Sequence, residues 1–275
     1  ILCPVLINGI GPFPEMGIEG AAWATVCGRG LGVLYQVYQL LFVPHDMIQI
    51  RNVSWKPDLT VIKNLLGISG PATLQFIIQS ASWIFLAGIV AMGGSDASAG
   101  YQTAIRLVVF FILPAWGMSN AAATLVGQNL GANEPKRAES SVIAIAKYNT
   151  WFMTFVMLFF LLGADLLISI FIPIETSAAY RIAVDALRII SLGYILYGIG
   201  MVLMQAFNGA GDTRTPTYIS FIGFWLIQIP LAYLLAIHFQ MGPHGAFIAV
   251  PSAEALVALM YYISFRKGKW KTVKV

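Results

Sequence analysis

Residues Gly100–Glu139 read GYQTAIRLVVFFILPAWGMSNAAATLVGQNLGANEPKRAE. They begin as an apolar run long enough for a helix that crosses a bilayer, which takes about 20 residues. Polar or small residues recur along one face of this helix, at Gln102, Arg106, Gly117, Asn120, Thr124 and Gln128. Because a polar face is costly in lipid, we expect it to face protein or a water-filled cavity. The rest of the chain should then supply other helices around such a cavity.

The composition is that of an integral membrane protein. Of the 275 residues, 58% are hydrophobic and 10% are charged, whereas soluble domains carry about 25% charged residues. The net charge of +4 does not indicate a nucleic-acid partner, because the basic residues lie at the ends of apolar segments. Cys3 and Cys27 lie within apolar segments, which predicts buried thiols and neither a disulfide nor a metal site.

Apolar runs predict seven complete membrane-spanning helices. A short apolar stub at 1–10 precedes them, and Ile1 opens inside this run without an initiator Met, as in a chain shortened at its N-terminus. Residues 44–58 mix charged and apolar side chains, which is typical of a linker at the membrane interface. The predicted spans are 17–43, 60–92, 97–129, 139–172, 177–208, 214–239 and 244–266.

Basic residues gather at one end of these predicted spans. The segments 51–63, 136–147 and 266–274 carry most of them, whereas the loops at the opposite end carry only Arg181. Cytoplasmic loops of membrane proteins are enriched in Lys and Arg. We therefore expect the C-terminus to be cytoplasmic.

The chain also contains an internal repeat. MGIEGAAWATVC from Met16 matches MGPHGAFIAVPS from Met241 without a gap. Both segments open helices of the same predicted direction, as in transporters whose two halves are related by an axis along the membrane normal. The same spacing gives the helix near residue 60 a counterpart far upstream of Ile1, which predicts about five further helices there.

Three motifs are similar to those of the multidrug and toxic compound extrusion (MATE) family. Arg106–Ala132, with its PAWG and VGQNLGA sequences, resembles the eighth helix of that family. Gln205–Pro216, QAFNGAGDTRTP, resembles the segment after the tenth helix, and Gly268–Trp270 the segment after the twelfth. The resemblance covers the whole chain and implies an all-α, polytopic bundle of twelve helices in two six-helix lobes.

The resemblance also implies a division of this chain. Residues 1–43 would hold the end of helix 5 and helix 6, 44–58 a cytoplasmic linker, and 59–275 the second lobe with helices 7–12 and a basic tail. The implied protein is a monomeric, multi-pass exporter in the plasma membrane of a bacterium. Its implied partners are the lipid bilayer, the helices of the first lobe, and small organic, often cationic, substrates.

The implied activity is antiport of these substrates against Na⁺ or H⁺, without a further cofactor. Some members of the family carry coupling acids in helices 7 and 10. The matching positions here hold Gln79 and Tyr197, neither of which ionises at neutral pH as a carboxylate does. The resemblance would allow a coupling acid in helix 1 instead, upstream of Ile1.

Polar and aromatic side chains share helical faces that suit a cavity for varied organic compounds. Bonds between packed helices are the alternative role for the same amides. These faces hold Gln75, Gln79 and Ser82 in one helix, Tyr194, Tyr197, Met201, Gln205 and Asn208 in a second, and Trp225 with Gln228 in a third.

The internal repeat pairs Arg29 with Glu254, and both lie well inside predicted spans. Ionised side chains at that depth are expensive unless paired or hydrated. We expect the two to face each other across the lobe interface, directly or through Arg106 or water, or else to bind partners within their own lobes. The predicted substrate or ion pathway is Arg29, Gln75, Gln79, Gln102, Arg106, Tyr194, Tyr197, Met201, Gln205, Trp225, Gln228 and Glu254.

Other classes of protein fit the sequence less well. The spacing of nucleophiles and bases predicts no enzyme, and the three histidines lack the spacing of metal ligands. A lipid-linked oligosaccharide flippase of related two-lobe architecture is the alternative to an exporter, although such flippases usually have a more cationic cavity. A seven-helix receptor is disfavoured by the repeat.

Overall fold

Two compact units make up the chain. The computed structural model describes residues 2–42, 57–172 and 178–273, and the chain divides into Ile1–Leu59 and Thr60–Val275. The regular structure of the described residues is helical throughout, which confirms the predicted all-α class. The predicted interfacial linker at 44–58 lies outside the described residues, apart from Pro57 and Asp58.

The N-terminal unit is a helical hairpin of α1 (Leu2–Asn8) and α2 (Gly17–Phe42). Gly20 lets the two backbones meet, because a Cβ at this position would lie 2.5 Å from the carbonyl oxygen of Leu6. The amide of Met16 donates a hydrogen bond of 3.1 Å to the same oxygen.

Most side chains of α2 are exposed in this unit, since α1 covers only its first turns. Cys3 and Cys27 are both exposed free thiols. The prediction that they are buried is therefore wrong. The two thiols are exposed because this unit is small, and two helices cannot enclose every apolar residue that they carry.

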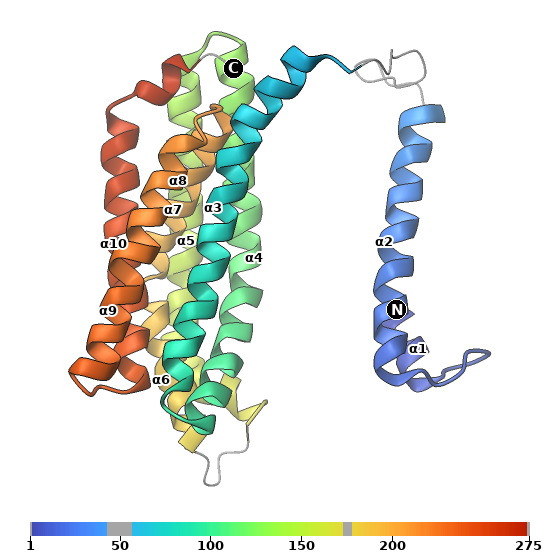
Figure 1. Ribbon diagram of the computed structural model, residues 1–275, viewed down its shortest axis with the longest axis vertical. Helices are drawn as coiled ribbons and strands as arrows, with labels where there is room; N and C mark the ends of the chain where they lie inside the picture. Colours follow the sequence, from blue (N-terminus) through green and yellow to red (C-terminus); the bar gives the residue numbers. More distant parts are fainter. Residues whose placement is uncertain (1, 43–56, 173–177, 274–275) are drawn as a thin grey trace. The chain divides into compact units, whose positions relative to one another are not determined.

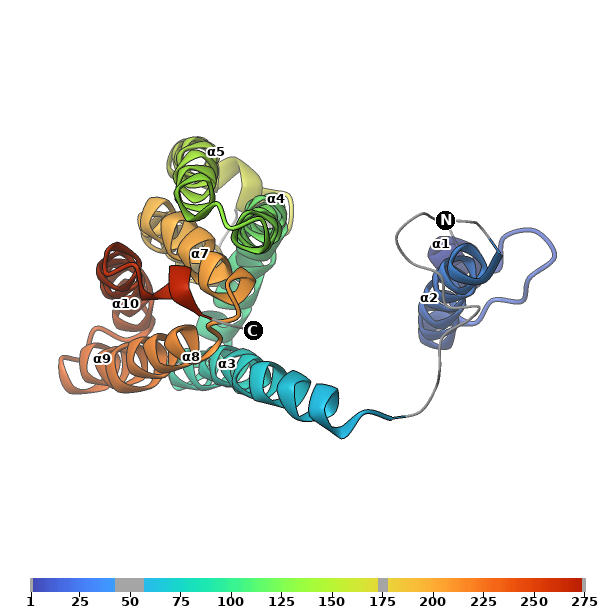
Figure 2. The same ribbon diagram turned by 90° about the horizontal axis from the view of Figure 1, so that it is seen from above.

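The C-terminal unit is a bundle of long helices (Figures 1 and 2). In Figure 2, which looks along the bundle, α7 lies between α5 and α10, and it packs against both. In contrast, α3 meets its neighbours through side chains and not through close backbone packing. The elements are α3 (Leu59–Ala91), α4 (Ser95–Gly131), α5 (Pro135–Ser169), α6 (Ala178–Ser191), α7 (Tyr194–Gly209), α8 (Arg214–Ser220), η1 (Phe221–Gln228), α9 (Ile229–Tyr233), η2 (Leu234–His238), α10 (Pro243–Arg266) and η3 (Lys269–Thr272).

A bend divides the helix that was predicted over 177–208. The axes of α6 and α7 differ by 54° across the break between Ser191 and Tyr194. Gly193 at this break lies against α10, where a Cβ would be 2.9 Å from Cα of Pro251. The absence of a side chain at Gly193 thus lets the bent chain approach α10 closely.

The run Arg214–His238 is continuous but irregular. Two π-helical segments, η1 and η2, flank the short α9, which begins with Ile229 and Pro230. Proline has no amide hydrogen to donate within the helix, and π-helical turns are a common response to such an interruption.

Two apolar clusters form the interior of this unit. The larger joins α3, α4, α5, α6, α7, α9 and α10 around Phe160, Leu187 and Phe247. The smaller lies toward η3, where Phe207, Tyr261 and Trp270 are almost wholly buried. Leu86 and Val90 of α3 belong to the larger cluster, so the C-terminal part of this helix contributes to the core.

Five segments of the described chain are long and apolar enough to cross a membrane, and a sixth is a bent pair of helices that passes only when it is counted as one span. They are α3, α4, α5, the run Arg214–His238, α10 and the bent pair α6–α7. The helix α2 is not among them, which corrects the predicted seven. Its apolar sequence is interrupted by Glu19, Arg29, Gln36 and Gln39.

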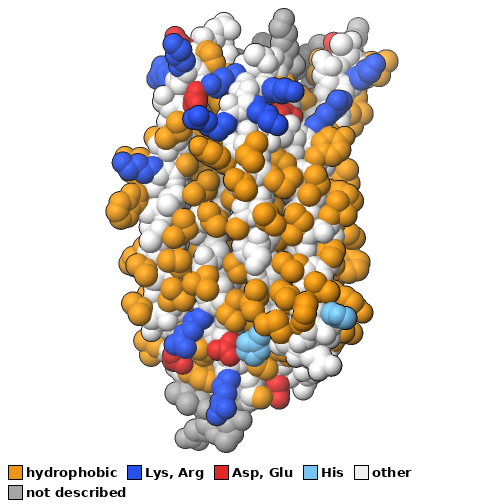
Figure 3. Space-filling model, turned by 90° about the vertical axis from the view of Figure 1, so that its left-hand side faces the viewer, with side chains coloured by type: hydrophobic (Ala, Val, Ile, Leu, Met, Phe, Trp, Pro, Cys, Tyr) orange, Lys and Arg blue, Asp and Glu red, His pale blue; other side chains and the backbone are white. Residues whose placement is uncertain are grey.

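Charged side chains mark the two ends of the bundle on the face that Figure 3 shows. Lys and Arg gather mainly at one end, while apolar side chains cover the middle. This distribution is that of a multi-pass membrane protein. The direction in which the bundle crosses the membrane stays a prediction.

Candidate functional site

A cavity of about 380 Å³ lies in the C-terminal unit between α3, α4, α7, the α8–η1 run and α10. Its volume is in the range of small-molecule sites. The lining is mostly aromatic and apolar, with amides and one carboxyl group. The side chains that define it are Gln75, Phe76, Gln79, Trp83, Ile112, Trp116, Tyr197, Met201, Met204, Gln205, Asn208, Ser220, Phe224, Glu254 and Tyr261.

The chemistry of this lining suits organic compounds of varied shape. Aromatic faces attract organic cations, and the flexible thioethers of Met201 and Met204 adapt to different ligands. Neither Lys, Arg nor His contributes to the lining formed by the described residues, and Glu254 is its one acidic residue. The described lining therefore offers one ionisable carboxyl group and no basic side chain.

Helix α3 supplies the amide wall. Gln75 and Gln79 lie one turn apart, so both reach the same side of the helix. Nε2 of Gln79 donates hydrogen bonds to Oγ of Ser220 at 3.2 Å and to Sδ of Met204 at 3.3 Å. Oγ of Ser220 also lies 3.3 Å from the hydroxyl of Tyr261. This chain of contacts joins α3, α7, α8 and α10 at the cavity.

Helix α7 supplies a second polar wall. Nδ2 of Asn208 donates a hydrogen bond of 2.8 Å to Oε1 of Gln205, whose amide nitrogen donates to Oδ1 of Asn120 in α4. Oδ1 of Asn208 is buried without a partner among the described residues. An unpaired buried acceptor is costly, and the residue that carries it lines the cavity.

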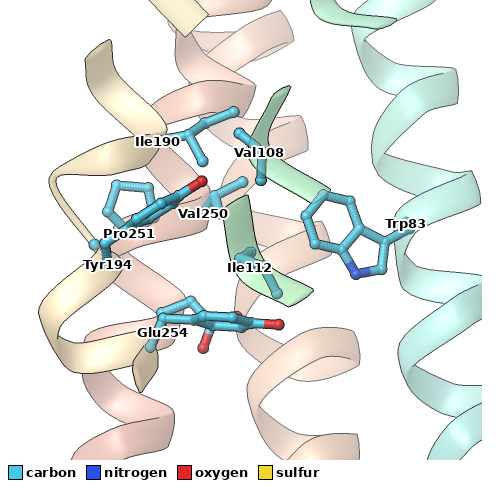
Figure 4. Close-up of a pocket in the computed structure, with 10 residues that line it drawn as sticks. Trp83, Val108, Ile112, Ile190, Tyr194, Val250, Pro251 and Glu254 are labelled. Carbon is cyan, nitrogen blue, oxygen red and sulfur yellow. The ribbon is translucent and has the colours of Figure 1, made fainter. Parts of the chain in front are cut away.

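Glu254 lies at the junction of this cavity with a smaller chamber. The chamber has a volume of about 20 Å³, enough for one water molecule. Tyr197 also lines it, as do Trp83 and Tyr194 (Figure 4). Glu254 is only 6% exposed, and none of the ion pairs found in the described parts of the chain includes it.

The cavity brings together half of the residues predicted for the pathway. Gln75, Gln79, Tyr197, Met201, Gln205 and Glu254 line it, and Tyr194 lines the adjoining chamber. Trp225 and Gln228 instead form hydrogen bonds with α3 outside the cavity. Nε1 of Trp225 donates to the carbonyl of Ile78, and Oε1 of Gln228 accepts from the hydroxyl of Ser82. Their predicted role in the pathway stays a prediction.

Three other predicted residues lie away from this cavity. Gln102 and Arg106 are exposed on α4, as is the rest of its polar face. Arg29 is exposed on α2. Because Arg29 belongs to one unit and Glu254 to the other, their pairing also stays a prediction.

Several residues that line the cavity were not predicted from the sequence. Trp83 follows Gln79 by one turn, and Tyr261 follows Glu254 by two turns, so the helical period could have found both. Ser220 and Phe224 are also one turn apart, but the sequence carries no signal that separates their face from the face of Trp225 and Gln228. No group of three His, Cys, Asp or Glu side chains within the described ranges is placed to hold a metal ion.

Comparison with known proteins gives consistent matches. The family model MatE matches residues 71–234. The "Probable multidrug resistance protein NorM" of Thermotoga maritima is 28% identical over 97% of this chain and 56% of its own length. The "Probable multidrug resistance protein YoeA" of Bacillus subtilis is 27% identical over 100% of this chain and 59% of its own.

A solved structure shares the fold. It is the outward-facing conformation of a multidrug resistance MATE family transporter of the MOP superfamily, with a TM-score of 0.87 and 23% sequence identity. The match covers 99% of this chain and 60% of that one. The chain thus spans little more than half the length of the curated relatives and of this structure.

Proposed function

The chain belongs to the MatE family, whose members are membrane transporters and not enzymes, and we propose that it forms part of an exporter of small organic compounds. The cavity of about 380 Å³ in the C-terminal unit carries this proposal. Its aromatic, thioether and amide lining gives broad contact without a fixed shape, as a transporter of many compounds requires.

The transport that we propose is secondary and active. Export of a compound is coupled to entry of Na⁺ or H⁺, and the two lobes of the complete protein move against each other to expose the cavity to either side. The first lobe supplies the opposite wall. The protein lies in the plasma membrane as a monomer. Its C-terminus is in the cytoplasm, because the tail from Arg266 to Lys274 is basic and cytoplasmic segments are enriched in Lys and Arg.

The charge of the cavity favours an exporter over a lipid-linked oligosaccharide flippase. Such lipids carry phosphate groups, which call for Lys or Arg near their binding site. The described lining offers Glu254 in place of a basic residue, and Arg106 lies outside it. A cavity whose one ionisable lining residue is a carboxylic acid instead suits cationic substrates.

Dye export from cells tests this function. The full chain encoded by the gene is expressed in bacteria that lack their main efflux pumps, and accumulation of ethidium is followed by fluorescence. We expect lower accumulation than with an empty vector, and loss of this difference when Ala72→Trp fills the cavity that Ala72 lines.

The matched control is Ala144→Trp, since Ala144 is exposed on α5 and lies outside the cavity. It should export normally at an equal membrane level. Equal export by Ala72→Trp would show that this cavity is not the route, and absence of any dye or drug export by the wild type would contradict the proposed function.

A further inference from the structure

Glu254 occupies the middle of a membrane-spanning helix. It lies near the centre of α10, which runs from Pro243 to Arg266. At a rise of 1.5 Å per residue it is about 17 Å from either helix end, which is close to half the thickness of a bilayer core. The carboxyl group is therefore far from both aqueous surfaces, and the cavity is its route to them.

The described lining around Glu254 contains no Lys, Arg or His side chain. Tyr194 and Tyr197 of α7 line the same chamber as Glu254, and Tyr261 of α10 lines the same cavity; these phenols are neutral near pH 7. The lining from α3 is Trp83 with the amides of Gln75 and Gln79, while α4 contributes Val108 and Ile112.

An ionised carboxylate in such a place is costly unless a cation accompanies it. Within the described lining the cation has to be a species that enters the cavity. Either a proton or an organic cation satisfies this requirement, and one carboxylate accommodates one of them at a time.

Resting on the proposed function, we propose that Glu254 is the substrate-charge site of this cavity, where a proton and an organic cation compete for one carboxylate. While an organic cation is bound, the carboxylate of Glu254 is ionised and balances its charge. When the cation leaves, a proton from water binds the carboxylate and restores neutrality, and its release allows the next cation to bind. No other co-reactant is needed.

The groups around Glu254 suit both occupants. The rings of Trp83, Tyr197 and Tyr261 offer faces for a delocalised or quaternary ammonium charge. The small chamber beside Glu254 has room for one water, and the hydroxyl of Tyr194 is buried on this chamber without a partner in the described structure. In Figure 4 this hydroxyl points toward Ile190 and away from Glu254, so a water in the chamber would serve the carboxyl group of Glu254 alone as a path for the proton.

The test measures equilibrium binding to the purified full chain in detergent, from about pH 5 to about pH 9. The probe is tetraphenylphosphonium, whose positive charge does not change with pH. We expect the affinity of the wild type to rise at least tenfold (~1.4 kcal/mol) across this range as Glu254 loses its proton. Glu254→Gln should bind about tenfold more weakly at high pH, with no dependence on pH.

Two further variants make the result specific. Glu254→Asp keeps a carboxylate and should keep the pH dependence. Asp96→Asn removes an exposed carboxylate at the start of α4, outside the cavity, and should match the wild type. Nile red, an uncharged aromatic dye, should bind Glu254→Gln as well as it binds the wild type, which shows that the cavity of the variant is formed.

The outcomes separate this inference from the proposed function. If Glu254→Gln binds tetraphenylphosphonium with the affinity and pH profile of the wild type, the carboxylate is not the site, even where cells still export ethidium. If Nile red binding is lost in Glu254→Gln while Glu254→Asp shows no pH dependence, the inference also fails. If the wild type exports no compound, the proposed function itself is wrong.

Discussion

The hydroxyl of Ser82 in α3 donates a hydrogen bond of 3.1 Å to Oε1 of Gln228 in η1, and both side chains are buried. Similar bonds join α3 to other residues of the continuous run of α8 and η1. Thr217 donates to the carbonyl of Pro71 at 2.8 Å, and Nε1 of Trp225 donates to the carbonyl of Ile78 at 3.1 Å. Because α3 makes few close backbone contacts with its neighbours, these polar bonds attach it to the bundle together with the buried side chains of Leu86 and Val90.

Ser82→Ala should lower the free energy of unfolding by ~1 kcal/mol, because it leaves the buried side-chain oxygen Oε1 of Gln228 without a hydrogen-bond donor. The double variant Ser82→Ala with Gln228→Leu should recover part of this loss, since both polar groups are then removed. Thermal unfolding of the purified protein in detergent measures the effect. Ser140→Ala is the control, because Ser140 is exposed and bonds only within α5. Equal stability of Ser82→Ala and Ser140→Ala would contradict a role in holding α3.

Gly223→Ala should destabilise the contact between η1 and α10 by ~1–3 kcal/mol. A Cβ on Gly223 would lie 2.0 Å from Cγ2 of Val257, so the two helices would have to separate. Adding Val257→Ala should restore much of the stability by making room. Gly88→Ala, where a Cβ meets nothing within 4 Å, should be neutral or stabilising. Equal stability of Gly223→Ala and Gly88→Ala would contradict the close contact between Gly223 and Val257.

Trp270→Ala should cost ~3–5 kcal/mol of stability. Trp270 is 0% exposed, stacks on Phe265 with ring centroids 4.9 Å apart, and donates from Nε1 to the carbonyl of Phe265. Trp151→Ala is the matched control, because Trp151 is 70% exposed on α5; it should change stability far less. A similar loss in both variants would argue against docking of η3 on the core.

The neighbouring ion pair should contribute much less than Trp270. Nζ of Lys271 lies 2.6 Å from Oε2 of Glu139, but both side chains are partly exposed. We expect Lys271→Ala to cost less than ~1 kcal/mol and the cost to fall in high salt. A loss as large as that of Trp270→Ala, unchanged by salt, would contradict this ranking.

Gln79→Ala should change drug preference while the dependence of export on Na⁺ or pH remains. Gln79 lines the cavity through an amide that bonds Ser220 and Met204, and an amide does not titrate. Export of several compounds, each measured across ion gradients, tests this expectation of the proposed exporter. Loss of the Na⁺ or pH response with unchanged substrate binding would assign Gln79 to the coupling site.

The amino-acid sequence by itself determined the class of protein and most helix positions. Apolar runs of about 20 residues have few stable forms other than membrane-spanning helices, so α3, α4, α5 and α10 were predicted within a few residues. The period of 3.6 residues also placed Gln75 with Gln79, and Tyr197 with Met201, on shared faces.

Only the tertiary structure decided which of those faces meet, because a helical period relates residues of one helix and carries no information about its partners. Packing turned Gln228 and Trp225 toward the backbone and side chains of α3, left Gln102 and Arg106 exposed on α4, and bent the chain at Gly193 against Pro251. It also placed Glu254 beside Tyr197 and Trp83. That single carboxyl group in an aromatic cavity results from contacts among α3, α7 and α10, three helices that are far apart in the sequence.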